Sequence, residues 1–334
     1  MRSLVLTIES DRYEEVNNFL IPRSLRRLGH EVTLGDVNTL RIIANSVFVD
    51  GAAFDGGQVG DDHVRMNESV ECESFDFVWL LDYAHPRLER EFFQIMWVLE
   101  QRVPFINRPS SMYFVNSKIG VIGLQSRGAF ADTHVFNRES DITRVITDNR
   151  SADDWVIKPP NLGCGADVYL LQRGDPNFSS IIQSSTGNTR QKYEMHSRGS
   201  YGLAEQYAVL QRFIPEMRQA ENRVIFAGGE FVGGYKKSST GSEFRGNYAV
   251  GGVETALDAS DEDIELCRTV ATELREHGIN YVGFDVAKSY IVEVNLVNPG
   301  GISGQLNATG EDIGDVACSA ALAGLMGDPV TSRR

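Results

Sequence analysis

The pattern of apolar and polar positions divides the beginning of the chain into a strand, a helix and a second strand. Residues 3–8 form a short apolar run that predicts a buried strand. Apolar residues then recur at helical spacing over 16–28, and Gly29 follows as the expected C-cap. Residues 31–34 predict the next strand. A strand, a helix and a strand in this order begin a parallel α/β unit.

The same alternation of strands and helices continues along the chain. Two further strands and the helix between them are predicted over residues 75–81, 89–101 and 103–107. The stretch 49–73 is rich in Gly and Asp, and we expect it to be irregular. Another helix is expected over 110–124, with Ser110 or Ser111 as its N-cap.

The middle of the chain changes character and contains a glycine-bearing turn. Its strand, helix and two further strands are predicted over residues 131–136, 141–147, 155–158 and 168–171. Gly163 and Gly165 lie between the last two strands, whereas dinucleotide-binding and P-loop motifs place a glycine turn between a strand and a helix. The pattern therefore favours a flap whose N–H groups can approach phosphate. A plain hairpin turn is the alternative.

The last third of the chain combines predicted strands with a long polar segment. The expected strands and helices cover residues 208–214, 223–226, 231–235, 261–277 and 312–326. Residues 236–252 are rich in Gly and Ser, and a loop of this length inside a compact domain is often a lid. Arg245 and Asn247 in this segment are candidate donors to phosphate or carboxylate. Lys236 and Lys237 are expected to face solvent.

A predicted hairpin over 281–295 carries three oxygen-bearing side chains. Its first strand contains Asp285, and its second ends with Glu293 and Asn295. Residues two apart in a strand point to the same face, so Glu293 and Asn295 lie together. Oxygen ligands on neighbouring strands suit a hard cation such as Mg²⁺ shared with substrate phosphates. The alternative is an exposed strand face with two solvated acids.

Composition and charge narrow the class of protein. The chain has 334 residues, of which 42% are hydrophobic and 23% charged, enough for two or three domains. No apolar run approaches the roughly 18 residues that span a bilayer, and the first residues resemble a strand rather than a secretion signal. The net charge of −14 argues against nucleic-acid binding. Four widely spaced cysteines favour a reducing cytoplasm: Cys72, Cys164, Cys267 and Cys318.

Seven short motifs occur in a fixed order and carry a resemblance to a known family. They are Asn107-Arg-Pro109 with Lys118, Lys158-Pro159 with Gly163-Cys-Gly165-Ala166, Gly174-Asp-Pro-Asn177, Gln211-Arg-Phe-Ile-Pro215 with Arg223, Glu243-Phe-Arg245-Gly-Asn247 with Gly251-Gly252, Val282-Gly-Phe-Asp285, and Val292-Glu293-Val-Asn295. In this order and at these gaps they resemble the ATP-grasp carboxylate–amine ligases, and within them the bacterial glutathione synthetase type.

The resemblance implies an α/β fold, with α+β character in the C-terminal half. It predicts a Rossmann-like pre-ATP-grasp domain over 1–120, followed by a two-part ATP-grasp domain. The first part, 121–205, would carry the glycine flap, and the second, 206–330, the lid and the Mg-ATP site. Members of this family are commonly dimers or tetramers, so a homo-oligomer is expected.

The resemblance also assigns roles to residues. ATP and Mg²⁺ (or Mn²⁺) are the implied cofactors, and amino acids or peptides the implied substrates. The residues expected to hold the nucleotide are Lys118, Lys158, Gly163, Gly165, Ala166, Gln211, Arg212, Phe213, Ile214, and Glu216 or Glu221 at the ribose. The metal ligands would be Asp285, Glu293 and Asn295, and the catalytic residues Arg223, Arg245 and Asn247. The substrate would contact Asn298, Gly300 and Gly301.

The implied activity is ATP-dependent amide formation through an acyl phosphate, with glutathione from γ-glutamylcysteine and glycine as the leading product. The chain departs from that type at Asn298-Pro299-Gly300-Gly301 and at Leu81–Arg87, both places where substrate is held. A ligase with another substrate pair is therefore the first alternative. An ATP-binding regulatory protein without activity is the second, and retention of Asp285 and Glu293 argues against it.

Overall fold

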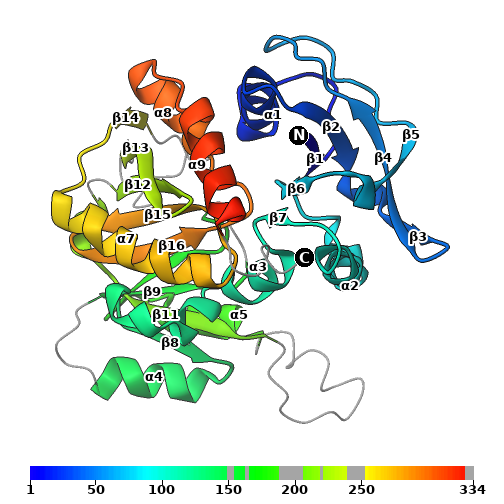
Figure 1. Cartoon of the computed structure of the whole chain (residues 1–334). Helices are drawn as coiled ribbons and strands as arrows, with labels where there is room; N and C mark the ends of the chain where they lie inside the picture. Colours follow the sequence, from blue (N-terminus) through cyan, green and yellow to red (C-terminus); the bar gives the residue numbers. More distant parts are fainter. Residues whose placement is uncertain (149–153, 162–164, 188–205, 219–220, 239–252, 328–334) are drawn as a thin grey trace.

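The computed structural model describes residues 1–148, 154–161, 165–187, 206–218, 221–238 and 253–327 (Figure 1). Three sheets, of seven, four and five strands, organise this part of the chain. Short 3₁₀ helices connect the elements: η1 (Val37–Thr39), η2 (Cys72–Ser74), η3 (Pro86–Leu88), η4 (Gly120–Gly123), η5 (Gln125–Ala129) and η6 (Pro215–Arg218). No helix of the described residues is long and apolar enough to cross a membrane.

The N-terminal sheet is built on four parallel strands. Its strands run in the order β3-β4-β2-β1-β6-β7, and β5 pairs with β4. The parallel strands are β1 (Arg2–Thr7), β2 (Glu31–Asp36), β6 (Phe77–Leu80) and β7 (Phe105–Ile106). The helices of this part are α1 (Asn17–Arg27), α2 (Glu89–Glu100) and α3 (Pro109–Val115). Gly29 has a φ of +86° and ends α1 as predicted.

Two expectations for this region were wrong. The stretch expected to be irregular contains most of β4 (Ser46–Ala53) and all of β5 (Glu68–Glu71), and β3 (Arg41–Ile43) precedes them. The strand β4 extends the sheet antiparallel to β2, and β3 and β5 pair with β4, because Val47 and Val49 lie on one face of β4 and are buried. The helix predicted to reach 124 is only α3, whose N-cap is Arg108 with Pro109 in the first turn.

The four-stranded sheet is antiparallel and carries the glycine turn. Its order is β10-β9-β11-β8. The strands are β8 (Thr133–Phe136), β9 (Asp154–Lys158), β10 (Tyr169–Gln172) and β11 (Ala208–Arg212), and the helices are α4 (Glu139–Asp148) and α5 (Phe178–Ser185). The prediction that the glycine turn joins two antiparallel strands is confirmed for β9 and β10. The division of the chain at 120 and 205 stays a prediction, and the membership of β11 in this sheet favours a second boundary after Arg212.

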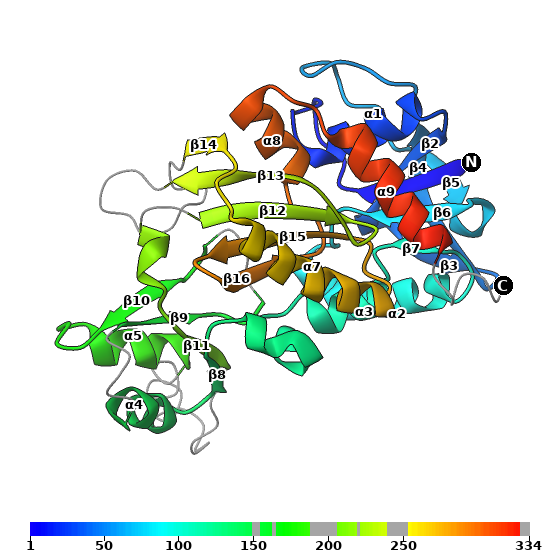
Figure 2. The same ribbon diagram turned by 60° about the vertical axis from the view of Figure 1, so that its left-hand side comes forward.

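The five-stranded sheet lies between helices on both faces (Figure 2). Its order is β14-β13-β12-β15-β16. On β12, Val224 and Phe226 pack toward α7, whereas Ile225 and Ala227 pack toward α8 and α9. The strands are β12 (Glu221–Ala227), β13 (Glu230–Ser238), β14 (Val253–Ala256), β15 (Tyr281–Ala287) and β16 (Tyr290–Asn295), and the helices are α7 (Asp261–Glu276), α8 (Gly301–Thr309) and α9 (Gly314–Met326).

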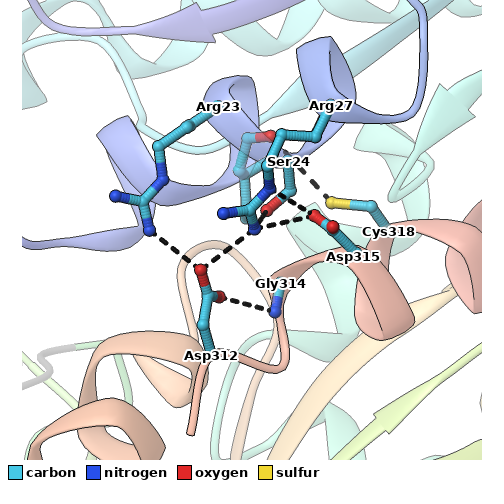
Figure 3. A network of polar contacts seen from close by, with 8 residues as sticks. Arg23, Ser24, Arg27, Asp312, Gly314, Asp315 and Cys318 are labelled. Atoms are coloured by element: carbon cyan, nitrogen blue, oxygen red, sulfur yellow. Dashed lines mark hydrogen bonds and ion pairs between the residues drawn. The ribbon is translucent and has the colours of Figure 1, made fainter. Parts of the chain in front are cut away.

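Polar contacts join α1 to the C-terminal helices. Figure 3 shows Arg23 and Arg27 of α1 reaching Asp312, at 2.9 and 3.0 Å, just before α9 begins. Arg27 also pairs with Asp315 at 2.7 Å. The backbone N–H of Gly314 donates to Asp312. These contacts fix the N-terminal sheet against the five-stranded sheet and therefore fix the region around residue 300 between them.

Candidate nucleotide and ligase site

The predicted hairpin is confirmed and brings the three candidate metal ligands together. Lys288 and Ser289 form the two-residue connection between β15 and β16, both with positive φ, at 42° and 62°. Asp285 lies directly opposite Glu293, and Gly283 lies opposite Asn295. Directly paired and alternate residues share one face of a sheet, so Asp285, Glu293 and Asn295 point to the same side.

Asp285 is the most buried of these side chains, 2% exposed, and Arg223 on β12 pairs with it. The guanidinium is bidentate: Nε donates to Oδ1 at 2.6 Å and Nη2 to Oδ2 at 2.9 Å. Its remaining Nη1 donates to the carbonyl of Pro299. The predicted catalytic arginine therefore orients a predicted metal ligand and holds the loop that leads into α8.

Lys237 is buried at this site, which corrects the expectation that both neighbouring lysines face solvent. It is 5% exposed, and its Nζ lies 2.9 Å from Asp285 and 2.5 Å from Glu221. Lys236 points to the other face of β13 and pairs with Asp258 at 2.8 Å. The two lysines occupy successive strand positions, so their side chains have opposite directions.

The electrostatics of this cluster are dominated by burial and by charge pairing. Burial alone would raise the pKa of Asp285, but the charges of Arg223 and Lys237 overcome it and hold that pKa well below its usual range. Burial raises the pKa of Glu221 against the opposing charge of Lys237. Burial alone would lower the pKa of Lys237, but the negative charges of Asp285 and Glu221 outweigh this effect and raise the pKa.

Lys118 and Lys158 line one small cavity between the four- and five-stranded sheets, of about 30 Å³. The Nζ of Lys118 lies 3.0 Å from Glu293 Oε1. The Nζ of Lys158 donates to Gln211 Oε1 at 2.9 Å and faces the carbonyl of Val292 at 3.5 Å. Burial lowers the pKa of Lys158 to about 8. Two cations beside a candidate metal ligand form a site suited to phosphate.

The candidate adenine and ribose residues lie near the end of β11. The backbone N–H groups of Arg212 and Phe213 donate to the carbonyls of Asp132 and Asp154, so these two N–H groups are already used within the chain. Glu216 is partly exposed and pairs with Lys288, whereas Glu221 is buried against Lys237. Contact of Arg212, Phe213, Ile214 and either glutamate with ATP stays a prediction.

The candidate substrate residues lie where the N-terminal sheet meets α8. Asn298 Nδ2 donates to Asn18 Oδ1 at 2.6 Å, and Asn18 in turn donates to Asp82 at 2.5 Å. Burial raises the pKa of Asp82. Gly300 has a φ of +68°, and a Cβ on Gly301 would meet the side chain of Ile225. Gly300 takes the left-handed N-cap conformation, and α8 begins at the next residue.

The remaining site predictions fall at the flap and the lid. Gly165, with a φ of +70°, and the exposed Ala166 lie at the described edge of the flap. Gly163, Arg245 and Asn247 lie outside the described residues.

Sequence reasoning missed two further parts of this region. The burial of Lys237 could have been predicted, because side chains alternate between the two faces of a strand and Lys237 lies two residues after the end of the strand predicted over 231–235. The structural role of Asn107 could not have been predicted from anything but its motif. Asn107 is buried, and its side-chain amide accepts hydrogen bonds from the backbone N–H groups of Asn280 and Tyr281 and donates to the carbonyls of Tyr281 and Leu296. It fixes both ends of the hairpin to β7.

The candidate metal ligands fit a cation that is shared with phosphate. Asp285 and Glu293 supply two carboxylates and Asn295 an amide on the same face. Among the residues that the structure describes, no three His, Cys, Asp or Glu side chains gather into a metal site. Mg²⁺ commonly takes one or two carboxylates and completes its shell with phosphate oxygens and water.

The order of the sheets and the paired lysines, arginine and acids define an ATP-dependent ligase of the ATP-grasp class. The sequence model of the family described as "Prokaryotic glutathione synthetase, ATP-grasp domain" matches residues 121–309, and the chain belongs to this family. The predicted α/β ATP-grasp fold and the recognition of the family are thereby confirmed. Ligases of this class use ATP and divalent metal ions.

Relatives and solved structures agree with this assignment. The chain is 27% identical to the glutathione synthetase of Synechococcus elongatus over 305 residues, which cover 87% of this chain and 88% of that one. It is 24% identical to the glutathione synthetase of Rhodopseudomonas palustris, covering 93% and 96%. The fold is similar to that of D-cycloserine synthetase DcsG (TM-score 0.66, 14% identity, 97% and 100% covered). It is also similar to the ATP-grasp ligase PsnB complexed with minimal precursor, Mg and ADP (TM-score 0.60, 16% identity, 97% and 98% covered).

Proposed function

We propose that this ligase joins a carboxylate to an amine through an acyl phosphate, and that its leading reaction is glutathione formation from γ-glutamylcysteine and glycine. The observation that carries the proposal is the pairing of Asp285 with Glu293 beside the cavity of Lys118 and Lys158. Acids that can hold a cation thus lie beside lysines that can hold phosphate. The substrate pair is inferred from the similarity of this chain to the glutathione synthetases named above.

Two steps account for the chemistry. A carboxylate oxygen of the first substrate attacks the γ-phosphorus of ATP, the bond from that phosphorus to the bridging oxygen breaks, and ADP leaves. The amine nitrogen of the second substrate then attacks the acyl carbon, and inorganic phosphate leaves as the amide forms. The amine loses its proton in this step. No side-chain nucleophile is required, so positioning and charge stabilisation supply the catalysis.

The residues of this chain have distinct tasks in these steps. Lys118 and Lys158 would hold the phosphates of ATP, and Asp285, Glu293 and Asn295 would hold Mg²⁺. When bound, the cation supplies positive charge to the phosphate oxygens. Arg223 keeps the Asp285 carboxylate in place and fixes Pro299. The backbone N–H groups at Gly300 and Gly301 begin α8 and are candidates to stabilise the substrate carboxylate.

Exclusion of water is the second requirement, because an acyl phosphate hydrolyses readily. The segments 163–166 and 238–250 would cover the site as flap and lid, with Gly163, Arg245 and Asn247 contacting phosphate. The left-handed backbone of Gly165 at the flap edge supports close approach of N–H groups to the nucleotide.

Glu293→Gln tests the proposal. Glu293 is partly exposed, so the substitution removes a charge with little cost in folding. Asp285→Asn would instead remove the carboxylate that Arg223 pairs with and one of the two that Lys237 pairs with, all of them buried. With Mg-ATP, γ-glutamylcysteine and glycine, we expect kcat/KM for ADP and glutathione formation to fall about 100-fold. The control is Glu254→Gln, a partly exposed glutamate on β14 at the opposite edge of the same sheet, which should leave turnover unchanged.

Two results would count against the proposal, each against a different part. Undiminished turnover by Glu293→Gln would show that the candidate metal site is misassigned. ADP release with other amino acids or dipeptides, but none with γ-glutamylcysteine and glycine, would remove glutathione as the product and keep amide formation. A ligase with another substrate pair is the second candidate function. The Asn298-Pro299-Gly300-Gly301 sequence favours it, because this segment departs from the glutathione synthetase type and its Asn298 is hydrogen-bonded to Asn18. Absence of substrate-dependent ADP release from any pool would exclude both.

A further inference from the structure

A groove of about 1050 Å³ lies on the surface formed by η3, α2, α3 and η4. The helices α2 and α3 lie side by side in both views of the molecule (Figures 1 and 2). Pockets for small ligands commonly have volumes of about 300–1000 Å³, so this groove has room for more than a small polar dipeptide.

Four aromatic residues form a continuous row along this groove, which we call the aromatic groove: Tyr83, Phe93, Tyr113 and Phe114. The ring centroids are 5.1 Å apart for Tyr83 and Phe93, 4.6 Å for Phe93 and Tyr113, and 5.1 Å for Tyr113 and Phe114. Phe114 is 69% exposed and Tyr113 is 49% exposed. Tyr83 and Phe93 are half-buried behind these two exposed rings, and together the four form an apolar surface of the kind that marks a binding site.

The aromatic groove adjoins the lysine cavity. Asn116 and Ser117 line both hollows, and the next residue, Lys118, reaches Glu293. Asn161, just before the flap, also lines the groove. A ligand in the groove would therefore extend toward the place where the γ-phosphate of ATP is expected.

The charges along the groove limit what it can bind. Arg87 and Arg90 line it together with Glu89 and Glu91, so positive and negative charges are balanced. A strongly anionic ligand, such as a second nucleotide, would meet as much repulsion as attraction. An uncharged side chain that stacks on the exposed rings, attached to a small polar backbone, fits both the rings and the mixed charges.

We propose that the aromatic groove binds the side chain beside the reacting carboxylate, and that this ligase prefers carboxylate substrates with an aromatic or large apolar side chain. The inference rests on the proposed amide-forming function and, within it, favours the second candidate, a substrate pair other than γ-glutamylcysteine and glycine. The cysteinyl side chain of γ-glutamylcysteine is too small to cover the exposed rings. A γ-glutamyl dipeptide that ends in phenylalanine or leucine carries the side chain that would cover them, and it reacts with ATP and glycine by the same two steps.

The test compares γ-glutamyl dipeptides that end in alanine, cysteine, leucine or phenylalanine, each with glycine and Mg-ATP, by ADP release and product mass. We expect kcat/KM to be about tenfold higher for the phenylalanine than for the alanine dipeptide. Phe114→Ala and Tyr113→Ala, made separately, should each remove most of this difference and leave the alanine dipeptide within about twofold. The matched control is Trp97→Ala, because Trp97 is 57% exposed on α2 but does not line the groove.

Three results would overturn the inference. The first is equal kcat/KM for all four dipeptides in the unmodified ligase. The second is an equal loss for every dipeptide in the Phe114 and Tyr113 variants, with unchanged thermal midpoints. The third is a dimer, seen by sedimentation, that Phe114→Ala dissociates and Trp97→Ala does not, which would assign the groove to a second copy of the chain.

A binding measurement separates this inference from the proposed function. Calorimetry with a non-hydrolysable ATP analogue and each dipeptide requires no turnover. If no dipeptide is turned over but the phenylalanine dipeptide binds in a Phe114-dependent manner, the groove assignment stands and the proposed reaction fails. If none binds, the groove assignment fails.

Discussion

Replacement of Lys237 by methionine tests the charge cluster at the hairpin. Lys237 lies between Glu221 and Asp285, and Arg223 is the other cation beside Asp285. Methionine has nearly the same length, so Lys237→Met removes the charge and keeps most of the packing. Asp285 retains Arg223. Glu221 keeps no partner in this cluster within hydrogen-bonding distance and becomes a buried, uncompensated carboxylate.

The size of the effect follows from that carboxylate. Removal of one partner of a buried ion pair costs about 3–5 kcal/mol. For a cooperative unit of about 150–250 residues, this cost corresponds to a decrease of roughly 6–20 °C in the thermal midpoint. Lys236→Met is the matched control, since Lys236 neighbours Lys237 in sequence but pairs with the exposed Asp258. An exposed ion pair contributes about 0–1 kcal/mol.

Thermal unfolding followed by circular dichroism, on both single variants and on Lys237→Met with Glu221→Gln, completes the experiment. The double variant removes the uncompensated charge as well, so its midpoint should recover by the equivalent of about 1–3 kcal/mol relative to Lys237→Met. Equal midpoints for the Lys236 and Lys237 variants would refute the burial of Lys237. A double variant no more stable than Lys237→Met would refute the assignment of the loss to Glu221.

Two further predictions follow from the hairpin and its neighbours. Burial lowers the pKa of Lys158 to about 8, so its Nζ loses its charge as the pH rises through that value, and affinity for ATP, measured by calorimetry, should fall above it. Lys158→Met should bind ATP more weakly below that pH and show no such step; a step that persists in the variant would contradict the assignment. Asn107→Ala removes four hydrogen bonds to Asn280, Tyr281 and Leu296, which should lower the free energy of unfolding by about 3–5 kcal/mol in thermal melts. Asn307→Ala, which loses one exposed contact to Glu254, serves as its control, and equal melting of the two variants would contradict the role of Asn107.

Several local features could be predicted because they depend on residues close in sequence. The helix α7 begins where Ser260 accepts from the backbone N–H of Asp263 and three acids follow, which is a pattern readable from the sequence. The connection at Lys288 and Ser289 is short enough to require a hairpin. Once the hairpin forms, the two-residue periodicity places Glu293 and Asn295 on one face.

Other features depend on contacts between distant parts of the chain, and the sequence did not reveal them. The strand β4 forms because β2 offers a pairing edge, although its surroundings are rich in Gly and Asp. The direction of Asn298 depends on Asn18, which belongs to the N-terminal sheet. The close packing of α8 on β12 depends on Gly301, which can approach Ile225 only without a Cβ.

The hairpin with Asp285, Glu293 and Asn295 illustrates the division between sequence and tertiary structure. The sequence by itself determined that these three side chains share one face, because strand periodicity and a short connection are local properties. Only the tertiary structure decided their electrostatic state. It brings Arg223 and Lys237 to Asp285, and Lys118 to Glu293, from elements far along the chain. Burial and charge pairing act through space, so they were settled only when the sheets packed together.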